Sequence, residues 1–211
     1  IVEEGAEPTH VCVLRAGYLY RQKLVGSGAR QILAVHLPGD IADLHNALLA
    51  RADHSLRALT AGNAALIPRE EVVALAERRP QVAMAMWRET LLDAVILREW
   101  MAGIGRRTAQ ARLAHLLCEL IVRSHANSGE PRVAYDIPMS QEQLADCTGM
   151  TAIHLNRMLM SLERDGTIAR RGRSLSVIDW DKLSMLGDFN PAYLQVPATG
   201  FAITDPLTAA A

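Results

Sequence analysis

The chain has 211 residues, half of them hydrophobic, so it can bury one large core or two small ones and is not expected to be disordered. A formal net charge of −1 excludes a polycationic nucleic-acid coat and a strongly acidic protein, but it is compatible with a locally basic face. The three cysteines, Cys12, Cys118 and Cys147, are far apart and form no CxxC pair, which argues against a disulfide framework or a thiolate metal site.

The sequence contains neither a run of 18 apolar residues nor a signal peptide. We therefore expect a cytoplasmic protein without a membrane anchor. Because the first residue is Ile1 rather than Met, we also expect that a native N-terminal segment precedes it.

Short strands are predicted from Val11 to about Pro68, where apolar residues alternate or cluster between turn residues. The breaks fall at Gly17, Gly26, Gly28, Pro38, Gly39 and Gly62. This pattern indicates a compact antiparallel barrel or sandwich. The segment "GSGAR" is interpreted as a hairpin turn, since it is too short for a phosphate-binding loop.

Two helices follow the strands. Residues 69–80 predict a short helix that Pro80 ends, and residues 80–105 predict a long one with proline at its start and glycines at its end. In the long helix, Met84, Trp87, Leu91 and Val95 form an apolar stripe that further residues widen. One intramolecular partner would leave part of this surface exposed, so we favour a dimerisation helix. The alternative is the central core helix of a monomer.

The C-terminal half predicts a helix-turn-helix. An amphipathic helix, "RRTAQARLAHLLCELIVRSHA", leads through a polar link to Ser140, which stands three residues before Gln143 in the arrangement of a capping box. Gly149 interrupts the short helix that follows, Thr151 can cap the next one, and Gly166 closes it.

A hairpin wing is predicted after the second helix, with the basic turn of residues 170–173 between two short strands. "DWDKLSML" predicts a final capped helix, and the tail from Asn190 is expected to be extended. Residues 106–178 contain ten arginines against seven acidic residues, the excess that a DNA-binding module would carry.

The second helix of the pair has an outer face suited to reading bases. Leu155, Met158, Leu159 and Leu162 fit an inward face, which leaves Ala152, Ile153, Asn156 and Arg157 outside. Arginine can bind guanine, asparagine can bind adenine, and an apolar side chain can contact a thymine methyl group. We therefore assign base reading to Ile153, Asn156 and Arg157. Phosphate contacts are assigned to residues near helix starts and in the wing: Ser140, Gln141, Thr151, His154, Arg170, Arg171 and Arg173.

From Ile1 to about Leu186 the chain resembles the Crp/Fnr transcriptional regulators. The resemblance rests on "EEGAEPTHVCVLRAG", "LPGD", "RRTAQARLAHLL" and above all "MSQEQLADCTGMTAIHLNRMLMSLERDGTI". It implies an α+β fold with an N-terminal antiparallel, jelly-roll-like β-roll, a long dimerisation helix and a C-terminal winged helix-turn-helix. The corresponding ranges are a cyclic-nucleotide-binding-like sensor domain at 1–79, truncated at its N-terminus, the dimerisation helix at 80–105, the winged domain at 106–188 and a tail at 189–211.

The resemblance also defines a candidate effector pocket, at Asp43, Leu44, His54 and Ser55. Nucleotide-binding members carry Gly-Glu for the ribose and Arg-Ser or Arg-Thr for the cyclic phosphate at these places. Leucine cannot accept the ribose hydrogen bond, and histidine is mostly neutral near pH 7, so we expect no tight binding of cyclic AMP. Three scattered cysteines cannot supply the four ligands of an iron-sulfur cluster. No cofactor or metal is expected, and the sequence does not identify the effector.

The reading helix departs from the family pattern as well. Arg157 matches the guanine-reading arginine of the family, but Ile153 replaces the acidic residue four positions earlier, and Asn156 replaces glycine or serine. A different DNA half-site is therefore expected.

These observations predict a homodimeric, sequence-specific DNA-binding regulator of transcription, not an enzyme, with double-stranded DNA and RNA polymerase as candidate partners. One alternative is a ligand-sensing β-roll protein that acts through protein contacts without binding DNA. Another is a metal-dependent, cupin-like enzyme that uses His10, His36, His45 and His54. Because no His-x-His pair occurs, scattered packing histidines are favoured over that metal site.

Overall fold

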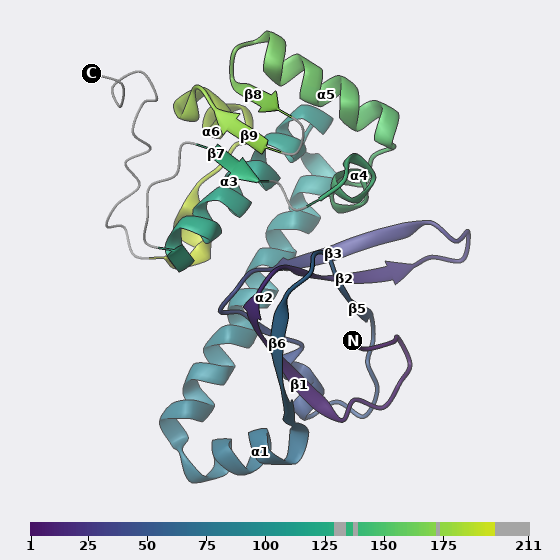
Figure 1. Cartoon of the computed structure of the whole chain (residues 1–211), viewed down its shortest axis with the longest axis vertical. Helices are drawn as coiled ribbons and strands as arrows, with labels where there is room; N and C mark the ends of the chain where they lie inside the picture. The colour runs from purple at the N-terminus through teal and green to yellow at the C-terminus, as the bar shows by residue number, and fades with distance from the viewer. Residues whose placement is uncertain (129–133, 137–138, 172–173, 197–211) are drawn as a thin grey trace. The chain divides into compact units, whose positions relative to one another are not determined.

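The computed structural model describes residues 1–128, 134–136, 139–171 and 174–196. The chain divides into two compact units, residues 1–97 and 98–211, and the long helix α2 (Pro80–Arg106) passes from the first into the second (Figure 1). This range agrees with the long helix that was predicted from the proline at its start and the glycines at its end. The finer boundaries expected at residues 79, 105 and 188 stay predictions.

The first unit is a β-roll of two antiparallel three-stranded sheets, with strand orders β4-β1-β6 and β3-β2-β5 (Figure 1). Its elements are β1 (His10–Ala16), β2 (Leu19–Leu24), β3 (Arg30–His36), β4 (Ile41–Ala42), the 3-10 helix η1 (Leu44–Ala47), β5 (Ser55–Ala58), β6 (Asn63–Pro68) and α1 (Arg69–Arg78). The predicted antiparallel strands and the short helix ended by Pro80 are confirmed.

Alternating apolar residues build the core of this roll. Cys12, Leu14 and Leu19 are buried together with Leu56 between the sheets. Gly17 makes the turn from β1 to β2 possible, because its φ is +82° and a Cβ there would lie 2.6 Å from the carbonyl oxygen of Ala61. The "GSGAR" segment is a hairpin turn as expected, in which the Val25 amide donates to the Ala29 carbonyl over 2.9 Å.

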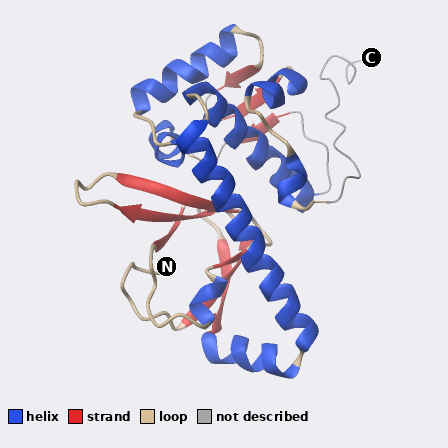
Figure 2. Ribbon diagram, turned by 180° about the vertical axis from the view of Figure 1, so that it is seen from behind, coloured by secondary structure: helices blue, strands red, loops and turns tan. Residues whose placement is uncertain are grey.

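The second unit packs helices against a small antiparallel sheet of order β7-β9-β8, which Figure 2 shows in red among the blue helices. Its further elements are α3 (Ala109–Ser128), β7 (Ala134–Asp136), α4 (Gln141–Thr148), α5 (Ala152–Arg164), β8 (Ile168–Arg171), β9 (Ser174–Val177), α6 (Trp180–Leu186) and the 3-10 helix η2 (Pro191–Leu194). The predicted helix-turn-helix, hairpin and final capped helix are all present. Cys118 of α3 and Cys147 of α4 are buried.

Two elements differ from the expectation. Strand β7 lies where no element was predicted. Its three residues are too few to show a periodic pattern, and the strand forms by pairing with β9, which is distant in sequence. The tail was expected to be extended from Asn190, but residues 191–194 form η2. There the Tyr193 hydroxyl donates to the buried Glu119 carboxylate over 2.7 Å, which fastens the segment to α3. The rest of the tail, residues 197–211, lies outside the described residues.

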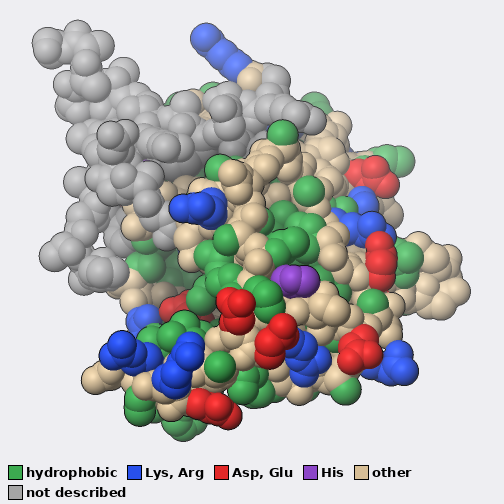
Figure 3. Space-filling model, turned by 60° about the horizontal axis from the view of Figure 1, so that its bottom comes forward, with side chains coloured by type: hydrophobic (Ala, Val, Ile, Leu, Met, Phe, Trp, Pro, Cys, Tyr) green, Lys and Arg blue, Asp and Glu red, His purple; other side chains and the backbone are tan. Residues whose placement is uncertain are grey.

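The surface carries charges of both signs. Figure 3 shows one face on which hydrophobic side chains lie between acidic and basic groups, so neither sign dominates the described part of that face. Among the described residues, every helix is too short or too polar to cross a lipid bilayer.

Candidate nucleic-acid interface and β-roll pocket

The turn between α4 and α5 is built from local hydrogen bonds. At the start of α4, the Gln143 amide donates to Ser140 Oγ over 3.2 Å, and the Ser140 amide donates to Gln143 Oε1 over 2.9 Å. This is the capping box that the sequence predicted. Gly149 ends α4 in the left-handed conformation, and Thr151 caps α5 by accepting a hydrogen bond from the His154 amide. These caps set the angle at which α5 leaves α4.

Helix α5 separates a buried face from an exposed one. Leu155, Leu159 and Leu162 are buried against the rest of the unit, as predicted. On the other side, the side chain of Ile153 is 70 % exposed and Arg157 is also exposed, while Asn156 is half-buried. An exposed isoleucine beside an exposed arginine suits contacts with another molecule.

The residues assigned to phosphate contacts at helix starts are on the surface. Ser140, Gln141, Thr151 and His154 are all exposed, at the N-termini of α4 and α5. Backbone amides and the helix dipole favour anions at such termini. The hydroxyl oxygens of Ser140 and Thr151 already accept capping bonds, but their hydrogens remain available to donate to a phosphate.

The described part of the wing consists of the paired strands β8 and β9. Arg171 at the end of β8 is exposed, whereas Arg170 Nη2 donates to Glu163 Oε2 of α5 over 2.6 Å. This hydrogen bond and the charge of Arg170 lower the pKa of Glu163. Arg173, the third arginine assigned to the wing, lies outside the described residues.

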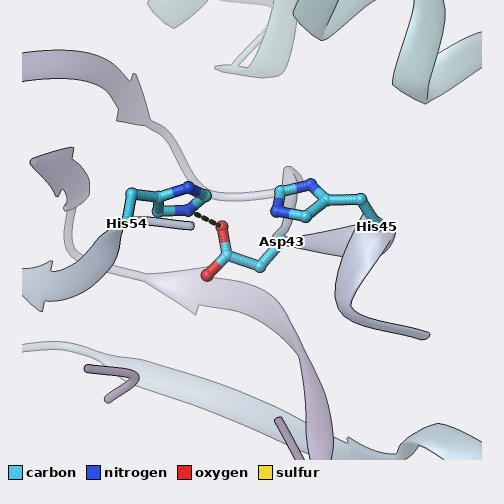
Figure 4. Close-up of side chains that lie close together, drawn as sticks. All are labelled: Asp43, His45 and His54. Atoms are coloured by element: carbon cyan, nitrogen blue, oxygen red, sulfur yellow. Dashed lines mark hydrogen bonds and ion pairs between the residues drawn. The ribbon is translucent and has the colours of Figure 1, made fainter. Parts of the chain in front are cut away.

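The β-roll contains a second cluster, which we call the β-roll pocket and define by Arg21, Asp43, His45 and His54. Asp43 is 1 % exposed, and its Oδ1 accepts from Arg21 Nε over 2.7 Å and lies 2.8 Å from His54 Nε2 (Figure 4). Burial raises the pKa of Asp43, but the hydrogen bond to His54 and the charge of Arg21 outweigh it and lower the pKa to about 2.

The backbone at Asp43 is unusual for a non-glycine residue. Its φ of 60° and ψ of 37° are left-handed, a conformation that costs on the order of 1 kcal/mol outside glycine. The chain therefore keeps a buried carboxylate at a position where glycine would be unstrained.

The histidines of the pocket lie close together. Figure 4 shows the rings of His45 and His54, whose centroids are 5.2 Å apart. His54 Nδ1 also lies 2.8 Å from Asp53 Oδ1. Burial and the nearby Arg21 charge lower the pKa of His45. Arg21 also donates through Nη2 to Asp93 of α2 over 2.7 Å, so the pocket is tied to that helix.

The structure brings together two of the four residues expected in the effector pocket, Asp43 and His54. Leu44 instead packs in a hydrophobic cluster with Val11 and Val72. Ser55 Oγ accepts a hydrogen bond from the Glu4 amide. Sequence reasoning missed Arg21, whose place depends on strand pairing, and it did not group His45 with Asp43, although the two are only two residues apart.

Comparisons with known proteins match both units. Residues 1–79 match the model of the cyclic nucleotide-binding domain, and residues 111–186 match that of the Crp-like helix-turn-helix domain. The fold and the exposed face of α5 thus define a β-roll protein with a winged helix-turn-helix of the DNA-binding type. The chain belongs to the Crp/Fnr family of transcriptional regulators, as its motifs indicated.

Particular relatives support this assignment. The chain is 31 % identical over 167 residues to the nitrogen fixation regulation protein FixK of Azorhizobium caulinodans, covering 79 % of this chain and 66 % of that protein. It is 27 % identical to the transcriptional activator FnrL of Cereibacter sphaeroides, covering 87 % and 75 %. The structure of FixK2 from Bradyrhizobium japonicum superposes with a TM-score of 0.81 at 27 % identity, covering 88 % of this chain and 91 % of that one.

Proposed function

We propose that the protein is a homodimeric regulator of transcription that places α5 in the major groove of a specific DNA site. The observation that carries the proposal is the exposed face of α5, where Ile153 and Arg157 project from a helix whose opposite side is buried. In helix-turn-helix proteins the N-terminal part of the second helix contacts base edges, and both residues lie there. The proposal assigns no enzymatic reaction, since the family consists of transcriptional regulators.

The base-reading roles follow from side-chain chemistry. Arg157 can donate two hydrogen bonds to guanine, and Ile153 can contact a thymine methyl group. Asn156 is half-buried at the edge of the exposed face, so it would modify which bases Arg157 and Ile153 prefer. Ser140, Gln141, Thr151, His154 and Arg171 would hold the DNA backbone, together with Arg173. Arg170 would contribute once it leaves Glu163.

The dimer is supported by an exposed apolar stripe on α2. Met84, Trp87, Leu91 and Met101 are each more than half exposed, and their spacing of three, four and ten residues keeps them on one side of the helix. Packing this stripe against that of a second copy would remove it from water. Two-fold symmetry would then place the DNA half-sites about 34 Å apart.

The β-roll would not be a cyclic AMP sensor. In the pocket, the carboxylate of Asp43 is buried and charged, and it would repel the cyclic phosphate of a nucleotide at close range. Arg21, the cation of the pocket, already pairs with Asp43 and Asp93. RNA polymerase is included in the proposal as a partner from the family resemblance alone.

The test is selection of the full-length protein against a random duplex pool, followed by sequencing, with and without metabolites from a cell extract. Enrichment of an inverted repeat with half-sites one helical turn apart is the expected result. Enrichment that depends on the extract would identify a ligand switch. If neither condition enriches a sequence, the regulator proposal is wrong, and the alternative of a β-roll protein that acts through protein contacts is favoured.

A further inference from the structure

Two buried atoms of the β-roll pocket have no hydrogen-bond partner. They are Asp43 Oδ2 and His45 Nε2. The nearby Asp53 Oδ1 is 3.8 Å from His45 Nε2, which is too far for a hydrogen bond. Leaving a buried polar atom unpaired costs free energy, and native structures seldom do so without a reason. Two such atoms in one cluster are free to contact a ligand that would satisfy both of them.

The cluster offers three donor atoms of the kind that bind transition metals. One ligand atom each from Asp43, His45 and His54 lies within 4.8 Å of the other two. Bonds of about 2.0–2.2 Å hold the ligand atoms of a tetrahedral zinc ion about 3.4 Å apart. Small side-chain rotations would bring the three ligand atoms of the cluster to this separation. We propose that Asp43, His45 and His54 bind a divalent first-row transition-metal ion, for which Zn²⁺ is the probe. Two imidazoles and one carboxylate suit such ions better than Mg²⁺ or Ca²⁺, which prefer oxygen ligands.

The neighbours of the three ligands already orient them for a metal. Arg21 Nε holds Asp43 by Oδ1, which leaves Oδ2 for the metal. Asp53 Oδ1 bonds His54 at Nδ1, which leaves Nε2, and this nitrogen would exchange its contact with Asp43 for the metal. Carboxylates that bond the second nitrogen of a metal-ligating histidine fix the orientation of its ring. The pocket therefore has supporting contacts as well as ligands.

The charges around the pocket also favour a divalent cation. Asp43 and Asp93 both pair with the guanidinium of Arg21, and a third carboxylate, that of Asp53, contacts His54 Nδ1. The chain also keeps Asp43 in a left-handed conformation at the start of η1, where glycine would be unstrained. A strained, buried carboxylate beside two histidines is expected where it has a ligand to bind.

The experiment measures zinc binding to the full chain, purified without a histidine tag and treated with a chelator. Titration calorimetry should give one Zn²⁺ per chain, and Co²⁺ in its place should produce the visible absorption of a low-coordinate nitrogen and oxygen site. Mg²⁺ should not compete. Absence of stoichiometric Zn²⁺ binding would overturn the proposal and leave the cluster a structural ion-pair network.

Matched variants distinguish this site from adventitious binding. Asp53→Asn, at an exposed position that supports His54 without being a ligand, should weaken zinc binding by about 10- to 100-fold. His45→Ala should weaken it further, and His10→Ala, which removes an exposed histidine of β1 outside the cluster, should leave it unchanged. Circular dichroism checks that each variant is folded, and His45→Gln replaces His45→Ala if that variant is not. Equal zinc affinity in folded variants at position 45, in Asp53→Asn and in His10→Ala would contradict the site.

This inference does not depend on the proposed DNA binding. Zinc binding is measured on the protein alone, so a chain that binds zinc and selects no DNA sequence would keep the metal site and lose the regulator. The reverse result would keep the regulator and lose the site.

Discussion

Arg170 of β8 and Glu163 of α5 form an ion pair that joins the wing to the helix proposed to read DNA, with 2.6 Å between Nη2 and Oε2. The adjacent Arg171 is exposed. In the protein without DNA, two consecutive arginines of one strand thus differ: Arg170 is paired within the protein, and Arg171 faces solvent.

Glu163→Gln should raise the affinity for all DNA sequences by a similar factor. The substitution removes a negative charge near the proposed interface and releases Arg170 for a phosphate. Stability should fall by no more than about 1 kcal/mol, because the pair is partly exposed. Fluorescence anisotropy with specific and random duplexes at two salt concentrations measures the effect. Glu77→Gln, an exposed change on α1, is the control, and equal affinities of the two variants would argue against the release of Arg170.

Arg157→Ala and Arg171→Ala should have different effects on DNA binding. The first should cost about 1–3 kcal/mol on the selected site and relax the preference at one base pair. Arg171→Ala should lower the affinity for all DNA sequences by a similar factor and reduce the dependence of that affinity on salt. Arg78→Ala, which removes an exposed arginine from α1, controls for net charge. The assigned roles are wrong if both variants weaken specific and random DNA equally.

Ser140→Ala and Gln141→Ala should separate helix capping from phosphate binding. Loss of the capping box should destabilise the second unit by about 1 kcal/mol, since the Gln143 amide loses its acceptor. Gln141 has an exposed side chain, so its removal should weaken DNA binding without this loss. Urea denaturation and DNA titration on the same samples measure both quantities. Equal stability of wild type and Ser140→Ala would contradict the role of the cap.

Leu91→Glu should dissociate the proposed dimer, because it places charges in the apolar stripe of α2. Ala85→Glu introduces the same charge on the opposite side of that helix, where Ala85 is exposed, and should leave the dimer intact. Sedimentation velocity over a range of concentrations gives the association state. A dimer that survives Leu91→Glu would place the interface elsewhere.

His115 should make folding stability depend on pH. Burial and the nearby Arg107 charge lower its pKa, whereas the unfolded chain takes up the proton at about 6.5. The unfolded state therefore binds more protons below that value, and stability should fall as the pH drops from about 6.5 through the lower folded pKa. Above about 6.5 this group should have no effect.

His115→Gln should flatten this part of the stability curve. The groups that face His115 are Arg107, Glu99, Glu119 and Tyr193, so the variant is compared with wild type at each pH to cancel their contributions. Urea midpoints between pH 5 and 8 give the comparison. Parallel curves for the two proteins would show that His115 does not titrate differently on unfolding.

The sequence alone determined those features whose stabilising contacts are local. The start of α4 at Ser140, the cap of α5 at Thr151 and the buried side of α5 depend on residues three or four positions apart, which a single chain segment reveals. The stripe on α2 follows from the same helical period. For this reason the helix-turn-helix and its outward residues Ile153 and Arg157 could be predicted.

The tertiary structure decided which distant residues meet. Arg21 reaches Asp43 and Asp93 across 22 and 72 residues of sequence, and the register of β2 in its sheet sets this contact. The pairing of Arg170 with Glu163 likewise needs the wing folded back on α5. Periodicity contains no information on such contacts, because they depend on how strands pair and helices pack. Asp43 and His54 were already grouped from the family resemblance, but the places of Arg21 and His45 beside them became visible only in the folded chain.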